Sequence, residues 1–180
     1  MVEQRSASEV FDTAALNSML RGEMAAVESY NLAIRHTAES PQKVGLTRIR
    51  DQHQNGVCAL RHWVRDLKES PSQSSGPWGF FATMVTGAAA AVGWKTLVAA
   101  LKRGERHGEA VYRAAMGNPD LPDELRHLIG AQLLPLCSEH LSKLDRLLAA
   151  VPPGSEGAAQ EKETSTFDNP CRGELQASPR

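Results

Sequence analysis

The chain has 180 residues, and its 20 basic and 21 acidic side chains leave a net charge of −1. This length fits one domain with some unstructured sequence, and the balanced charge provides no basic surface of the kind that nucleic-acid binding requires. Aromatic residues make up only 5% of the chain, while alanine and leucine are frequent and few stretches alternate polar with apolar residues. We therefore expect an all-α fold and no nucleic-acid partner.

In chain order, the pattern of apolar residues predicts four helices, over about residues 13–37, 41–69, 78–116 and 121–151. Asp12 is a suitable N-cap for the first helix, and Pro41 suits the first turn of the second. The run TGAAAAVG (residues 86–93) can divide the third helix, because glycine is unfavourable in a helix interior. Pro135 is expected to kink the fourth helix, since it removes one backbone hydrogen bond and clashes with the carbonyl of Ala131.

This pattern divides the chain into a flexible N-terminus over residues 1–11, a four-helix bundle over 12–151 and a disordered polar tail over 152–180. The tail has too few apolar residues to form a core of its own. The N-terminus has no apolar stretch of the signal-peptide kind. The three cysteines are odd in number and lie far apart, so we expect no disulfide framework. We therefore expect a cytoplasmic protein in a reducing compartment.

The apolar run over residues 78–101 is long enough to span a bilayer. It is rich in Gly, Ala and Thr, however, and Lys95 interrupts it. These features favour a buried or self-packing helix over a membrane span, and we predict no membrane partner.

Two similar segments, RGEMAAVESY (residues 21–30) and RGERHGEAVY (residues 103–112), lie in the first and third predicted helices. Apolar residues recur every three or four positions around both, and on this spacing Glu23 and Glu105 fall on the inward face of their helices. Tyr30 and Tyr112 follow two turns later on the same faces. The repeat therefore predicts a carboxylate and a phenol inside the bundle, twice.

The second and fourth predicted helices also share a pattern. Their inward positions are Leu46, Ile49, His53, Val57, Leu60 and Val64 in one helix, and Leu133, Leu136, His140, Leu144, Leu147 and Val151 in the other. The spacing is the same in both lists, and each contains one histidine at the same place. The chain is thus expected to be an internal duplication of a helix with an inward Glu followed by a helix with an inward His.

Four inward ionisable residues require a physical reason, because a buried carboxylate must be paired, protonated or bound to a metal ion. Carboxylate and imidazole groups suit iron, manganese or zinc, and helix bundles build metal sites from facing helices. Glu23, His53, Glu105 and His140 are therefore candidate metal ligands. Tyr30 and Tyr112 are candidates for hydrogen bonding to those ligands.

The sequence resembles a bacterial family of ferritin-like four-helix proteins of unknown function that carry Gly-Glu on the first and third helices. The resemblance covers roughly residues 10–150 and rests on short motifs in a fixed order. These are Leu16-Asn17 before Arg21-Gly22-Glu23, Ser75-Gly76-Pro77-Trp78-Gly79, Gly104-Glu105 with Tyr112, and His140 before Leu144-Asp145-Arg146-Leu147. It implies an antiparallel, ferritin-like bundle, a small homo-oligomer and no established reaction.

Ferritin-like di-iron enzymes take one Glu from two helices and Glu-x-x-His from the other two. On this resemblance Glu23 and Glu105 match the single glutamates, and His53 and His140 match the histidines. Arg50 and Cys137 stand where the remaining two glutamates would be, so di-iron oxidase activity is disfavoured and an enzyme is not expected.

Two interpretations remain open. One is a site for iron, manganese or zinc, beside which Arg50 and Cys137 lie and to which Cys137 can contribute a thiolate for zinc. The other is a structural or stress-associated oligomeric module that binds no metal, in which Arg50 lies between the two glutamates in a buried network and Cys137 only packs.

Overall fold

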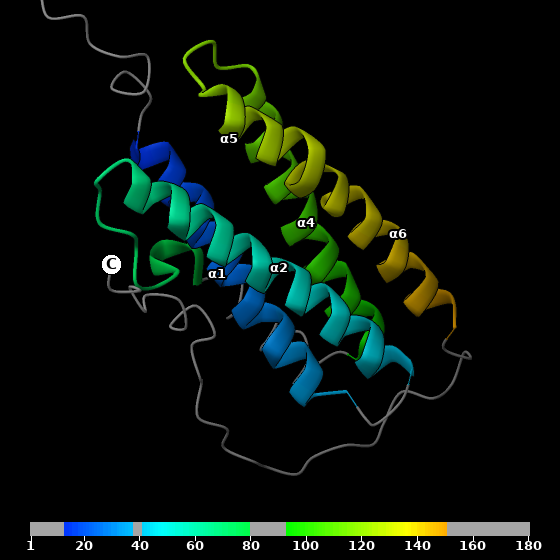
Figure 1. Ribbon diagram of the computed structural model, residues 1–180. Coiled ribbons are helices and arrows are strands. Elements are labelled where there is room, and N and C mark those ends of the chain that lie inside the picture. The colour runs from blue at the N-terminus through cyan, green and yellow to red at the C-terminus, as the bar shows by residue number, and fades with distance from the viewer. Residues whose placement is uncertain (1–12, 38–40, 80–92, 151–180) are drawn as a thin grey trace, which may run out of the picture.

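The computed structural model describes residues 13–37, 41–79 and 93–150. These residues form helices and no strand (Figure 1), which confirms the all-α prediction for this part of the chain. The predicted flexible N-terminus and the predicted disordered tail both lie outside the described residues.

Helix α1 (Thr13–Arg35) packs along helix α2 (Pro41–Asp66), and Figure 1 shows the two side by side. Pro41 is the first residue of α2. A backbone N–H at this position makes no hydrogen bond within the helix, so proline, which lacks the N–H, is well tolerated there. The sequence predicts six inward positions in each of these two helices. All are buried except Ile34 in α1, which is partly buried; the buried ones are Leu16, Leu20, Glu23, Val27 and Tyr30 in α1 and Leu46, Ile49, His53, Val57, Leu60 and Val64 in α2. The three- and four-residue spacing therefore identified the packed face of both helices.

The segment after α2 lies against α1 and ends in a short 3-10 helix, η2 (Gly76–Gly79). The side-chain oxygen of Asn17 accepts a hydrogen bond from the backbone N–H of Ser72 at 2.8 Å. The hydroxyl of Ser75 donates to the carboxylate of Glu28 at 2.8 Å. These contacts attach the predicted linker to the outer side of α1.

Helix α4 (Trp94–Met116) begins directly after Gly93, whose φ angle is 86°. Glycine reaches this left-handed region without steric penalty, so the chain turns into α4 at the end of the Gly- and Ala-rich run. This confirms that the predicted helix over 78–116 does not run unbroken through Gly93. Residues 80–92 lie outside the described part of the chain.

The predicted fourth helix consists of α5 (Asp123–Leu128), a π-helical turn η3 (Ile129–Leu133) and α6 (Leu134–Ala149). In the π turn the backbone N–H of Leu134 bonds to the carbonyl of Ile129, five residues earlier. Pro135 follows at once and has no N–H to offer to Ala131. The disturbance predicted at Pro135 takes the form of this wider turn, a common adjustment within α-helices.

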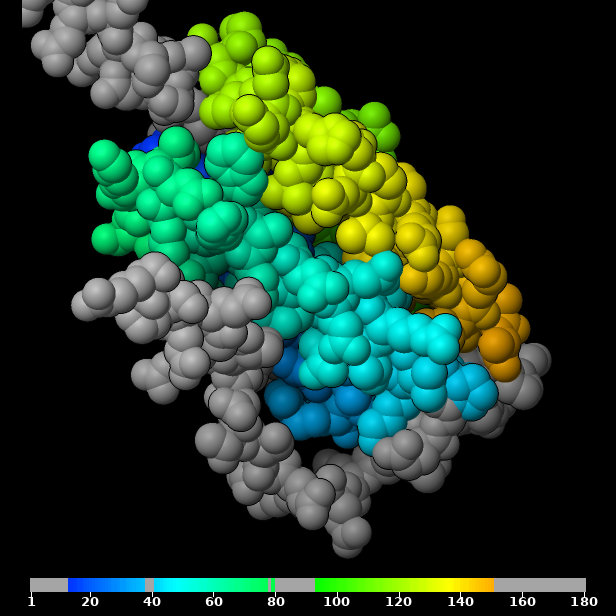
Figure 2. Space-filling view, viewed as in Figure 1, coloured from blue at the N-terminus to red at the C-terminus, as the bar shows by residue number. Residues whose placement is uncertain are grey.

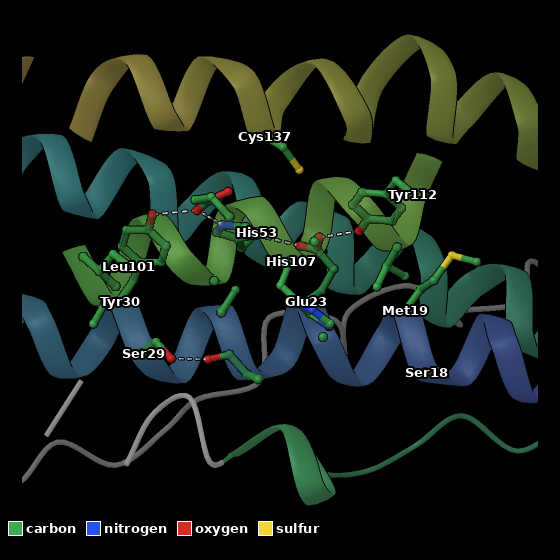
Figure 3. A pocket seen from close by; sticks show the side chains of 18 residues that line it. Ser18, Met19, Glu23, Ser29, Tyr30, His53, Leu101, His107, Tyr112 and Cys137 are labelled. Atoms are coloured by element: carbon green, nitrogen blue, oxygen red, sulfur yellow. Dashed lines mark hydrogen bonds and ion pairs between the residues drawn. The ribbon is translucent and has the colours of Figure 1, made fainter. Parts of the chain in front are cut away.

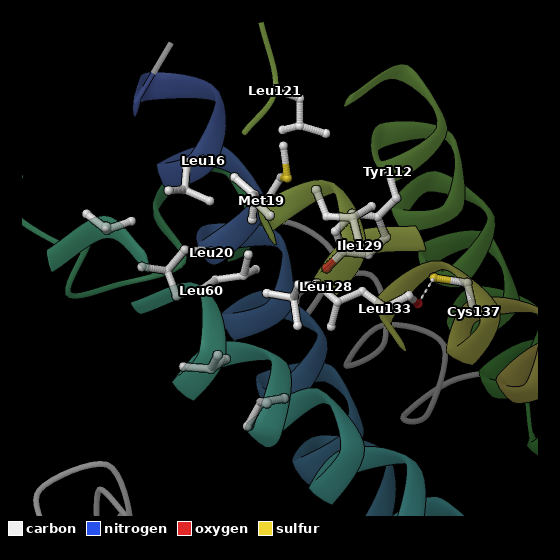
Figure 4. Close-up of a cluster of buried hydrophobic side chains, with 14 residues drawn as sticks. Leu16, Met19, Leu20, Leu60, Tyr112, Leu121, Leu128, Ile129, Leu133 and Cys137 are labelled. Atoms are coloured by element: carbon white, nitrogen blue, oxygen red, sulfur yellow. Dashed lines mark hydrogen bonds between the residues drawn. The ribbon is translucent and has the colours of Figure 1, made fainter. Parts of the chain in front are cut away.

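α6 packs along α4 and also contacts α2, next to which it lies on one face of the molecule (Figure 2). The interior contains two apolar clusters. The first joins the beginning of α1, the end of α2 and the α5–η3 segment, with Leu16, Leu60, Leu121 and Ile129 among its members (Figure 4). The second includes Tyr30, Leu46, Ile49, Leu97, Leu101 and Leu144. Along their helices, His53, Glu105 and His140 lie between these two clusters, and Glu23 lies between Leu20 and Val27 of the first.

None of the described helices is long and apolar enough to cross a membrane. The apolar run over 78–101, which raised that alternative, lies partly in α4 and partly outside the described residues.

The cysteines differ from the expectation. Cys58 is disulfide-bonded, whereas Cys137 is free and buried. The disulfide contradicts the prediction of reduced cysteines, on which the cytoplasmic assignment partly rested.

Candidate metal centre

Four helices bring Glu23, His53, Glu105 and His140 together in the interior. Their exposed fractions are 8%, 7%, 4% and 1%, respectively. The imidazole ring centroids of His53 and His140 lie 4.8 Å apart. We call these four residues the Glu/His cluster, which the sequence predicted correctly as a set of inward residues.

Each tyrosine of the repeated motif bonds to the glutamate of the other repeat. Tyr30 on α1 donates to Glu105 Oε1 on α4 at 2.6 Å, and Tyr112 on α4 donates to Glu23 Oε1 on α1. Both phenols are almost fully buried. For each, burial first and the neighbouring carboxylate second raise the pKa well above its usual value, so both tyrosines remain hydrogen-bond donors. The repeat therefore joins its two halves through reciprocal bonds (Figure 3).

His53 lies between the two carboxylates. Its Nδ1 is 2.9 Å from Glu23 Oε2, and its Nε2 is 3.0 Å from Glu105 Oε1. Burial alone lowers the pKa of His53, but the charges of Glu105 and Glu23 outweigh it and raise the pKa to about 10. Without a metal ion, His53 is thus an imidazolium that donates to both acids.

His140 approaches the same carboxylate from α6. Its Nδ1 lies 3.1 Å from Glu105 Oε2, and its Nε2 lies 3.2 Å from Gln52 Oε1. The ammonium of Lys143 donates to that amide oxygen at 3.1 Å. Because Lys143 can only donate, it fixes the oxygen of Gln52 toward His140, whose Nε2 must then carry hydrogen.

Gln52 and Lys143 were not identified from the sequence. Gln52 precedes the inward histidine of α2 by one residue, and Lys143 follows that of α6 by three, so neither falls on the inward spacing. Their long side chains reach the edge of the cluster from partly exposed positions. In the sequence, the available indication of their role was that each polar residue lies within three positions of an inward histidine.

Glu105 is the centre of the arrangement. It accepts from Tyr30 and lies within hydrogen-bonding distance of both histidines. Burial alone raises its pKa, but the charge of His53 and the hydrogen bonds of both histidines lower it well below the usual range. Glu105 is therefore ionised, with two imidazole nitrogens directed at its oxygens.

His53, Glu105 and His140 each offer one ligand atom, and these atoms lie within 4.8 Å of one another. Glu23 reaches His53 through the opposite ring nitrogen. Comparisons with protein families, with curated proteins and with solved structures find no match for this chain. The geometry of the site is that of a buried group of side chains able to hold a metal ion.

Arg50 does not lie between the glutamates. Its Nε bonds to Asp51 at 2.8 Å and its Nη1 to Asn31 at 3.0 Å, with 31% of the side chain exposed. The prediction that Arg50 adjoins the site is therefore wrong. A buried guanidinium would need full pairing, whereas these partners at the surface leave it in contact with water.

Cys137 does lie beside the cluster, and it lines cavities with His53 and His140. It is 3% exposed, and its thiol donates to the carbonyl of Leu133 at 3.6 Å. Burial and then the charges of Glu105 and Glu23 raise the pKa of the thiol strongly. A metal binds the thiolate, so these surroundings favour the packing role over the zinc-ligand role for Cys137.

Three glycines lie close to the two glutamates, and the reason for glycine differs between Gly56 and the other two, Gly22 and Gly104. A Cβ atom on Gly56 would lie 2.7 Å from Glu23 Oε2, so α2 has glycine where that carboxylate needs the space. Cβ atoms on Gly22 and Gly104 would have no atom of the described residues within 4 Å. Close helix packing therefore does not explain Gly22 and Gly104, although each weakens its helix by about 1 kcal/mol relative to alanine.

Proposed function

We propose that the chain is a metal-binding protein that holds one iron, manganese or zinc ion through His53, Glu105 and His140. The observation that carries this proposal is the buried group of ligand atoms from these three residues. Two neutral imidazoles and one carboxylate form a ligand set common to these ions.

The distances suit an ion between the three groups. Two ligand atoms bound tetrahedrally at about 2.0–2.2 Å from an ion lie roughly 3.3–3.5 Å apart. The ring nitrogens of His53 and His140 lie 3.0 and 3.1 Å from oxygens of Glu105. The ligand atoms of the three residues lie within 4.8 Å of one another, so a bound ion would draw the most distant of them closer together.

The outer nitrogen of each histidine already has a hydrogen-bond acceptor. Glu23 faces Nδ1 of His53, and Gln52 faces Nε2 of His140. Metal-bound histidines are usually oriented by such bonds, which also increase the basicity of the ligating nitrogen. In this proposal Glu23 orients a ligand rather than binding the ion directly, with Tyr112 holding its other oxygen.

A structural role is the second candidate, and the position of His53 supports it. Its two ring nitrogens donate to two carboxylates, so protons alone can satisfy the buried acids. The Glu/His cluster would then fix the packing of the helices in an oligomeric module without a metal ion.

For the fold, we infer an antiparallel, ferritin-like bundle that arose by internal duplication and assembles as a homo-oligomer. This inference is supported by the apolar cluster that joins the beginning of α1 to the end of α2 and by the reciprocal Tyr–Glu bonds. An oxygen-activating di-iron enzyme stays disfavoured, because Arg50 and Cys137 supply no carboxylate where that site needs two.

Metal content tests the proposal. The untagged protein is reconstituted with Fe²⁺ under anaerobic conditions, with Mn²⁺ or with Zn²⁺, and bound metal is measured per chain by mass spectrometry. We expect about one ion per chain in the wild type and in His62→Ala, a control that removes an exposed histidine. Glu105→Ala and His140→Ala should lose it.

Wild-type protein that holds no metal refutes the metal role and leaves the structural one. In that case the two cluster variants should still melt at lower temperature than the wild type, because each removes a partner of a buried charge. Metal bound equally by wild type and both variants would place the ion elsewhere in the chain.

A further inference from the structure

A cavity lies between α1 and α4, directly against the Glu/His cluster (Figure 3). Its volume is about 70 Å³, several times what one water molecule needs. Glu23, His53 and Glu105 form its polar end. Its other walls are mostly small or apolar residues, such as Met19 and Leu101.

Gly22 and Gly104 keep this cavity open. They lie on the two facing helices, each directly before a glutamate of the cluster, and both line the cavity. Within the part of the chain that the structure describes, an added Cβ atom at either position would meet no atom within 4 Å. Alanine would strengthen both helices and clash with nothing described, so the packing of the described residues gives no reason for glycine. A bound molecule that occupies this space would explain the glycine at both positions.

The charge of the lining indicates what kind of molecule fits. The described residues that line the cavity include His107 as well as His53, but no lysine or arginine to pair with an anion. A divalent ion in the proposed centre would be balanced by the carboxylates of Glu23 and Glu105. A neutral molecule with an apolar body therefore suits these walls better than a charged one.

We propose that this cavity binds a small neutral molecule, whose apolar body packs between α1 and α4 and whose nitrogen or oxygen donor atom binds the metal ion. The proposal rests on the proposed function, because His53, Glu105 and His140 supply three ligands and leave a coordination position for an outside molecule. The cavity contacts His53 and Glu105, so a molecule within it can reach an ion held there.

Pyridine is a suitable probe, since it is neutral at pH 8, has an apolar ring and offers one donor nitrogen. It is titrated into the Co²⁺-loaded full-length protein while the visible absorption of the cobalt is recorded. We expect a saturable change in the wild type. Gly104→Leu should weaken pyridine binding by about tenfold or more, because its side chain occupies the cavity, while the Kd for Co²⁺ changes less than about threefold.

Two further variants control for folding and helix propensity. Gly22→Ala adds one methyl group to the cavity and should weaken pyridine binding by about threefold while raising Tm by about 3 °C. Asn55→Ala improves helix propensity at an exposed position of α2, and we expect it to leave pyridine binding unchanged.

The outcomes separate this inference from the metal proposal. If cobalt binds but pyridine leaves its spectrum unchanged, or binds equally well to both glycine variants, the ligand proposal is wrong and the metal centre stands. If the wild type binds no cobalt, both proposals fail.

Discussion

Raising the pH should strengthen metal binding, because the ion must displace a proton from His53. In the metal-free protein both ring nitrogens of His53 donate to carboxylates, which raises its pKa to about 10. Coordination requires the lone pair of Nε2, so His53 releases one proton for each ion bound. At pH 7 the removal of a proton from a group with a pKa of about 10 costs roughly 4 kcal/mol, at about 1.4 kcal/mol per pH unit.

This cost disappears as the pH approaches 10. The Kd for Zn²⁺ should therefore fall about tenfold per pH unit, or about a hundredfold between pH 7 and pH 9. Titrations against a chelator of known affinity measure it, and calorimetry in buffers of different ionisation enthalpy counts the released proton. A Kd that changes less than about threefold over this range would refute displacement of a proton from His53. His62→Ala provides the control, because that exposed side chain should not alter the slope.

The remaining predictions concern the metal-free protein. Tyr30→Phe and Tyr112→Phe should each lower the free energy of unfolding by about 1.5–3 kcal/mol in denaturant titrations, since each removes a hydrogen bond to a buried carboxylate; losses below 0.5 kcal/mol would contradict the reciprocal bonds. Gly56→Ala should lower it by about 1–3 kcal/mol, because the new methyl group displaces the Glu23 carboxylate, whereas a stabilised variant would show that the space is not needed. The charged form of His53, with its raised pKa, stabilises the fold fully below about pH 6.5, so Tm should fall from pH 6.5 toward 10; a Tm that rises there would contradict this assignment.

The inward residues could be predicted from the sequence because helical spacing alone determines them. Positions three and four residues apart share one face of a helix, and this placed Glu23, His53, Glu105 and His140 in the interior correctly. The pairing of each tyrosine with the opposite glutamate could not be predicted. It depends on the axial position of α4 relative to α1. The spacing of residues within one helix carries no information on that position.

Arg50 shows a second limit of the sequence argument. It was assigned to the site because it occupies the Glu position of Glu-x-x-His. Its long side chain instead follows the surface to Asn31 and Asp51, where the charge stays hydrated. Backbone position fixes where a short side chain points, whereas a long charged side chain is directed by the partners within reach.

Glu23 was one of four equivalent candidate ligands in the sequence, and the structure distinguishes it from the others. It faces the nitrogen of His53 that points away from Glu105, so its expected contribution is to orient that ring. The periodic pattern could not separate a ligand from its hydrogen-bond partner, because both roles need an inward carboxylate at the same level of the bundle.

The coordination shell of the bound metal tests the central claim most directly. X-ray absorption spectroscopy at the zinc edge of the reconstituted protein should show two imidazole nitrogens and carboxylate or solvent oxygen at about 2.0–2.2 Å, with no sulfur. This result would agree with His53, Glu105 and His140 as the ligands. A sulfur atom at about 2.3 Å would indicate Cys137, and a shell of oxygen atoms alone would indicate a surface site; either result would contradict the account.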